Sequence, residues 1–172
     1  MGDKSVLISL KDRWWNKILS GEKAEEIRKT MPRQIEAEYD GDTAHFSPAL
    51  QVFVYLSGTG HVVGHFNCDK IKHWDSAHAE WAYSVGPIPG VSCIMPMSDT
   101  DAFERMRKKG CLTDEQIMDY FGDEDFKAYF WSVLNPTEYE TPIPLSDFGL
   151  NRPPQSWCYT EYTEPRNQPG ND

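Results

Sequence analysis

The chain has 172 residues, of which 39% are hydrophobic and six are tryptophan, so it can build one folded domain and is not expected to be disordered. Its 17 basic and 27 acidic residues give a net charge of −10, which excludes the broad basic face of a protein that coats long nucleic acid. Four cysteines without a CxxC pair, no secretory leader and no apolar run of about 20 residues predict a reduced, cytoplasmic protein that does not contact a membrane.

The charge is distributed unevenly along the chain. Residues 1–35 hold eight basic and five acidic side chains, a net of +3, whereas the remainder has a net of −13. This asymmetry is compatible with one local basic cleft that receives a nucleotide or a short RNA loop.

The N-terminal elements are a strand and a helix. Val6–Leu10 is a short apolar run and predicts the first strand. A helix is predicted over residues 13–19, with Asp12 as its N-cap and Gly21 as its stop. The composition of Gly21–Lys29 favours a helix, but its position between a glycine and a proline leaves an extended chain equally open.

The next elements form a predicted hairpin. Residues 31–50 are polar and interrupted by proline and glycine, so they are predicted to be mainly loop. Val52–Leu56 and His61–Ile71 are predicted strands, and Ser57–Gly60 is a predicted turn between them.

From about residue 74 to residue 122 the pattern becomes helical. Helices are predicted over Asp99–Lys109 and Thr113–Tyr120, and Thr113 with Gln116 matches a capping box. The acidic side chains between residues 114 and 125 are predicted to form a solvated face that lies away from any anion-binding cleft.

The C-terminal part returns to strands. Phe126–Leu134 and Gln155–Tyr159 are predicted strands, although the first half of Phe126–Leu134 is also compatible with a helix. Residues 165–172 are predicted to be a flexible tail. A loop is predicted from three prolines: Pro136, Pro142 and Pro144. The order of these elements predicts one α+β domain over residues 1–164, with a mixed or antiparallel sheet that closes into a barrel and a helical insertion at about 74–122.

Residues 21–28, GEKAEEIR, match the pattern GxKxxExR. This pattern is the signature of the ASCH domain family, whose fold is related to PUA domains. Three further segments resemble the same family: LISLKDRWWNKILS before the motif, VVGHF after it, and NPTEYETPIPLSDFGLNRPPQSWCY near the C-terminus, which is similar to ASCH proteins described as transcriptional regulators. The resemblance covers about residues 5–72 and 126–160, and the segment 74–122 has no counterpart in it.

The resemblance implies a small PUA-like mixed barrel with flanking helices, and a cleft beside the motif for RNA or a modified nucleoside, without a cofactor. Some small members of the wider family are amidohydrolases that act on acetylated cytidine with a lysine, a threonine three residues later and a distant glutamate. Lys23 matches that lysine, but Glu26 stands at the threonine position, so the hydroxyl partner is absent here.

Three charged residues of the motif can act together in two ways. Lys23 and Glu26 are neighbours only if the chain turns, whereas Glu26 and Arg28 share a face only if the chain is extended. In the functional hypothesis, Lys23 and Arg28 bind a phosphate or a base carbonyl, while Glu26 orients one of them or accepts from a base amine. In the structural alternative, the charges of the motif only form a structural ion pair, which ties the first helix to the barrel.

Side chains at strand ends extend this candidate site. One of the two adjacent tryptophans of the helix is predicted to enter the core, and the other to line the cleft or rest on the surface. The candidate ligand-binding residues are Lys23, Glu26, Arg28, Trp14, Tyr55, Ser57, Gln155 and Ser156. No metal site is predicted, because His61 and His65 share a strand face but would lie roughly 13 Å apart.

Three functions remain open at this point. The leading hypothesis is a domain that binds RNA, a nucleotide or a modified nucleoside and acts in transcription regulation. The second is a hydrolase, either an amidohydrolase of acylated nucleosides or a ribonuclease, with Lys23 and Glu26 as catalytic groups. The third is a non-catalytic interaction domain whose acidic insertion docks a protein partner.

Overall fold

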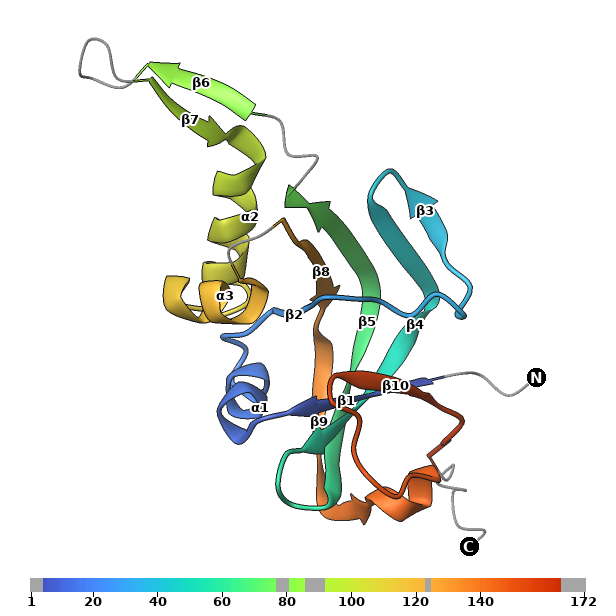
Figure 1. Cartoon of the computed structure of the whole chain (residues 1–172). Coiled ribbons are helices and arrows are strands. Elements are labelled where there is room, and N and C mark those ends of the chain that lie inside the picture. Colours follow the sequence, from blue (N-terminus) through green and yellow to red (C-terminus); the bar gives the residue numbers. More distant parts are fainter. Residues whose placement is uncertain (1–4, 77–80, 86–91, 123–124, 165–172) are drawn as a thin grey trace, which may run out of the picture.

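A computed structural model describes residues 5–76, 81–85, 92–122 and 125–164 of the chain. Over these residues a mixed sheet curls into a half-barrel flanked by helices (Figure 1). The strands of this sheet are β1 (Ser5–Leu10), β2 (Glu25–Arg28), β3 (Glu38–Asp40), β4 (Thr43–Leu56), β5 (His61–Asp75), β8 (Lys127–Ser132), β9 (Leu134–Pro144) and β10 (Trp157–Thr160). The remaining elements are α1 (Asp12–Leu19), α2 (Met97–Lys108), α3 (Asp114–Phe121), the 3₁₀ helix η2 (Leu145–Phe148) and a separate hairpin of β6 (Trp81–Val85) and β7 (Ser92–Pro96). The predicted α+β class and curled sheet are confirmed.

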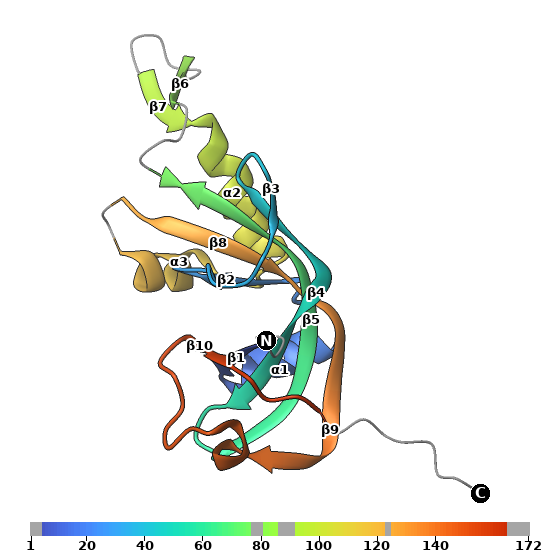
Figure 2. The ribbon, with the colours of Figure 1, turned by 90° about the vertical axis from the view of Figure 1, so that its right-hand side faces the viewer.

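The sheet has the order β10–β1–β4–β5–β8–β2, with β3 added to β4 and β9 added to β5. Only β1 and β4 run parallel among the described pairs, and all other pairs are antiparallel. Figure 2 shows how the long strands β4 and β5 bend, so that the two ends of the sheet approach one another. This curvature brings β2 and the start of β10 near the C-terminal end of β1.

The strand β1 is buried on both sides, which explains its continuous apolar sequence. Val6 and Ile8 belong to the main core together with Trp15, whereas Leu7 packs with Phe53 in a second core covered by η2. The predicted first strand is therefore confirmed, and it contributes to two hydrophobic cores.

The hairpin of β4 and β5 confirms the predicted strands and their turn at residues 57–60. The prediction of loop over residues 31–50 is wrong, because β3 and the first part of β4 lie there. These residues are polar on one side, but Ala44 and Phe46 are buried, and Ala44 pairs with Ile71 near the end of β5. A partner strand therefore stabilises a segment whose own composition does not favour a strand.

The helix α1 ends as predicted, at a turn in which Gly21 has φ +84°. Its predicted N-cap is wrong: Lys11 occupies the cap position without a side-chain cap bond, and Asp12 lies in the first turn. A carboxylate in the first turn stabilises the positive end of the helix dipole without capping an N–H group.

The prolines near the C-terminus do not form a loop, which corrects that prediction. They lie in β9, an 11-residue strand that pairs with β5. No described strand pairs with the other side of β9, so prolines without an N–H donor are tolerated there.

The predicted helices of the segment 74–122 are present as α2 and α3, and the capping box of Thr113 and Gln116 is confirmed. Met106 of α2 and Ile117 of α3 pack on Ile27 of β2 and Phe130 of β8. The two helices therefore cover the β2 end of the sheet (Figure 1). The predicted tail at 165–172 lies outside the described residues.

Cys68 lies in the core of the half-barrel, where burial raises the pKa of its thiol to about 12. Because the thiolate is the reactive form, we expect iodoacetamide at pH 8 to alkylate the half-buried Cys111 well before Cys68 in the folded protein. In urea both should react. Mass spectrometry of tryptic peptides measures this order, and early labelling of Cys68 in the native protein would contradict the described packing.

Candidate functional site

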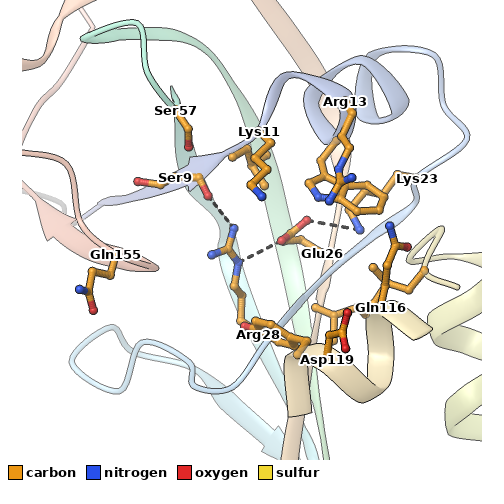
Figure 3. A pocket seen from close by; sticks show the side chains of 15 residues that line it. Ser9, Lys11, Arg13, Lys23, Glu26, Arg28, Ser57, Gln116, Asp119 and Gln155 are labelled. Atoms are coloured by element: carbon orange, nitrogen blue, oxygen red, sulfur yellow. Dashed lines mark hydrogen bonds and ion pairs between the residues drawn. The ribbon is translucent and has the colours of Figure 1, made fainter. Parts of the chain in front are cut away.

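A pocket of about 460 Å³ lies where α1, β1, β2 and α3 meet (Figure 3). Its wall also includes the turn after β4 and the chain just before β10. The turn after β4 reaches the pocket because the Ser57 N–H donates to the carbonyl of Leu10, at the end of β1. The site is thus assembled from segments that are far apart in the sequence.

The motif GEKAEEIR is half turn and half strand. The backbone N–H of Lys23 donates to the Lys17 carbonyl, which closes the turn after α1, and the strand β2 begins two residues later. Lys23 therefore reaches Glu26 from the turn, while Glu26 and Arg28 share one face of the strand. Both arrangements that the sequence left open occur together.

Lys23 lies at the floor of the pocket and is only 3% exposed. Its Nζ donates to the Gly110 carbonyl at 2.5 Å and lies 3.4 Å from Glu26 Oε2. The same Nζ stands 5.1 Å from the centre of the Trp14 ring, a favourable cation–π distance. A buried ammonium is thus held by a carbonyl, a carboxylate and an aromatic face.

Arg28 is also buried, and each of its three nitrogens donates to a protein acceptor. Nε donates to Glu26 Oε1 at 3.0 Å, and one terminal nitrogen donates to the Ser9 carbonyl at 2.9 Å. The other donates to the carbonyl and the Oγ of Ser156 at 3.3 Å and 3.2 Å. Arg28 therefore clamps β2 to the end of β1 and to the start of β10, and it fixes the position of Glu26.

Among the three charged residues Lys23, Glu26 and Arg28, Glu26 has one carboxylate oxygen that accepts no hydrogen bond. Its Oε1 receives the bond from Arg28, but its buried Oε2 has only the 3.4 Å ion pair with Lys23 and no hydrogen bond in the described part of the chain. Buried polar atoms are almost always hydrogen-bonded, so an orphan acceptor at a pocket wall points to a donor supplied from outside. The site is thus preorganised to accept an N–H or O–H of a ligand.

The wall formed by α3 corrects one sequence prediction. The acidic segment was expected to lie away from the cleft, yet Gln116, Asp119 and Tyr120 all line the pocket. Asp119 and Tyr120 lie three and four residues after Gln116, so the three side chains share one face of the helix, beside the buried Ile117. Burial raises the pKa of the Tyr120 phenol, which is neutral at pH 7.

Of the other predicted site residues, three line the pocket and two lie outside it. Trp14, Ser57 and Gln155 line the pocket together with Lys23, Glu26 and Arg28. Ser156 lies behind the pocket wall and accepts from Arg28, and Tyr55 lies outside the pocket in the second core. The pairing of β4 with β5 shifts register between Val54 and Tyr55. The Tyr55 hydroxyl accepts a hydrogen bond from the Gly60 N–H in the turn between these strands.

Sequence reasoning missed Ser9, Lys11 and Arg13 on one side of the pocket and the α3 residues on the other. The excess of basic residues before position 35 was the one signal for Lys11 and Arg13. The capping box predicted where α3 begins, but it did not predict which face of α3 packs against the sheet and which faces the pocket.

Within the described ranges, no three His, Cys, Asp or Glu side chains gather in a way that could hold a metal ion. The same residues include no helix with the length and apolarity to cross a membrane.

Comparison of the sequence with protein-family models and with curated proteins gives no match. Comparison with solved structures finds the ASCH protein of Zymomonas mobilis. A serine-to-alanine variant of it has a TM-score of 0.62 at 19% identity, covering 92% of this chain and 90% of that chain. The unmodified protein has a TM-score of 0.60 at 19% identity, covering 90% and 86%, and a tyrosine-to-phenylalanine variant has 0.60 at 18% identity, covering 90% and 88%. The chain therefore has the fold of ASCH domain proteins, as the motif at residues 21–28 predicted.

Proposed function

We propose that the pocket binds the base of a nucleotide or modified nucleoside, either free or as part of an RNA, and that the protein is a cytoplasmic regulator of the ASCH type. The observation that carries this proposal is the orphan acceptor of Glu26 beside the buried ammonium of Lys23. The volume of about 460 Å³ suits a single nucleotide unit.

The donor and acceptor at the pocket floor match the edge of a base. Lys23 Nζ has three N–H donors and makes one hydrogen bond, to the Gly110 carbonyl, so donors remain for a ligand. Beside it, Glu26 Oε2 accepts. A base edge with an N–H next to a carbonyl or ring nitrogen satisfies both atoms, and Trp14 and Tyr120 supply aromatic walls around it.

The test is calorimetric titration with the four ribonucleosides, N4-acetylcytidine and short oligoribonucleotides. We expect at least one probe to bind, and Glu26→Gln to weaken it about tenfold or more, because the amide replaces a charged acceptor and can turn an N–H toward the ligand. The matched control is Glu22→Gln, since Glu22 lies on the same turn but is 63% exposed. Binding of no probe, or equal binding by the Glu26→Gln variant, would refute the proposal.

The hydrolase alternative uses the same two side chains as catalytic groups, and their 3.4 Å contact at the pocket floor favours it over other chemistries. In the same samples, chromatography for deacetylated cytidine or shortened RNA separates the two functions. Products that form with the natural protein and not with Lys23→Ala would identify an enzyme, whereas bound but unchanged probes identify a binding domain.

A further inference from the structure

Two cations at the mouth of the pocket have no carboxylate partner. Lys11 and Arg13 are exposed and line the pocket, and neither forms an ion pair with any described residue. Seven other basic side chains of the described residues pair with carboxylates: Lys17, Lys23, Arg28, Arg105, Arg107, Lys108 and Lys109. On a chain with a net charge of −10, two neighbouring free cations at one pocket create a local positive potential.

The backbone adds to this potential at the same place. Lys11 is the N-cap of α1 and makes no side-chain bond to the first turn, so the N–H groups there have no side-chain cap. The N-terminal end of a helix favours an anion. The one carboxylate of this turn, Asp12, offsets part of this potential, but it accepts from Asn16 and does not line the pocket.

The two sides of the pocket mouth carry opposite charge. The α1 side presents Lys11 and Arg13, and the guanidinium of Arg13 is held 4.8 Å from the centre of the Trp14 ring. The α3 side presents the carboxylate of Asp119. An anion is therefore attracted to the first side and repelled from the second (Figure 3).

We infer that the ligand of this pocket is a phosphorylated nucleotide whose base reaches Glu26 and whose phosphate binds Lys11 and Arg13. This inference rests on the proposed function and narrows it, since a free nucleoside would leave both cations without a partner. The shared chemistry is a phosphate attached to a nucleoside, as a free nucleotide or as a link in an RNA strand.

The experiment compares each ribonucleoside with its 5′-monophosphate, and with a tetranucleotide of the best base, at 50 mM and 200 mM salt. We expect the monophosphate to bind about tenfold tighter than the nucleoside at low salt, and this ratio to shrink at high salt. In the double variant Lys11→Gln/Arg13→Gln the ratio should fall to near one. The control Lys70→Gln removes an exposed cation that does not line the pocket and should keep the ratio. Tighter binding of the tetranucleotide than of the monophosphate identifies RNA as the source of the phosphate, and equal or weaker binding identifies a free nucleotide.

Three outcomes would overturn the inference, and they are distinguishable from failure of the proposed function. If nucleoside and monophosphate bind equally well, the ligand is not a nucleotide, although the base pocket stands. If the monophosphate binds tighter and the double variant keeps the ratio, the phosphate does not lie at Lys11 and Arg13. If no probe binds at all, the base pocket itself is refuted and the phosphate assignment goes with it.

Discussion

Replacing Trp15 by alanine is expected to lower the free energy of unfolding by about 3–5 kcal/mol. The side chain of Trp15 is 1% exposed, and its ring belongs to the core between α1 and the sheet. Its Nε1 donates to Glu138 Oε2 at 3.1 Å, and Gly64 leaves the space that the ring fills, since a Cβ there would lie 2.6 Å from the ring. Truncation therefore opens a cavity that the surrounding strands cannot close. Urea unfolding followed by fluorescence measures the loss.

The neighbouring Trp14→Ala is the matched control, because the same side chain is removed from the same helix. Trp14 is half-buried and lines the pocket, so its loss should cost much less stability and should instead weaken ligand binding. The opposite pattern, with Trp14 essential for stability and Trp15 dispensable, would show that α1 is rotated relative to the arrangement described.

The second large effect is expected for Glu26→Ala, which should destabilise the protein by about 3–5 kcal/mol. The change leaves the ammonium of Lys23 and the guanidinium of Arg28 buried beside each other without their shared carboxylate. Breaking a buried charge network from one side costs more than the network contributes, because the remaining charges stay largely buried without their counter-charge. Thermal and urea unfolding of the purified variant test this.

For comparison, Glu22→Ala should change stability by no more than about 0.5 kcal/mol, since its ion pair with Lys17 is long, at 3.7 Å, and exposed. A loss below about 1 kcal/mol for Glu26→Ala would mean that Lys23 and Arg28 find other counter-charges or water. In that case Lys23, Glu26 and Arg28 would not form the rigid pocket floor that base binding requires.

Local patterns in the sequence predicted those elements whose cause is local. The capping box of α3 and the hairpin of β4 and β5 depend on residues within a few positions of each other, and both are present. The strand β9 and the first half of β4 were missed because pairing with β5, not their own composition, holds them in place.

The candidate site shows the same division. The motif pattern located Lys23, Glu26 and Arg28. The bend that brings these side chains together depends on backbone hydrogen bonds to Lys17 and Lys109, which lie outside the motif, so the spacing within the motif does not predict it. The pattern also could not tell which face of α3 turns toward the sheet, so Asp119 was placed on the wrong side. Tyr55 was grouped with the cleft because strand ends were assumed to face it, and its side chain packs in the second core instead.

The carbonyls of the turn just after α2 receive three donors from the motif: the backbone N–H groups of Ala24 and Glu25 donate to the Lys109 oxygen, and the Lys23 ammonium donates to that of Gly110. Grafting residues 21–28 into another barrel would thus transfer a lysine without the oxygen that partly neutralises it. Transfer of the site requires both segments as a unit, because the carbonyls that follow α2 fix the position of Lys23.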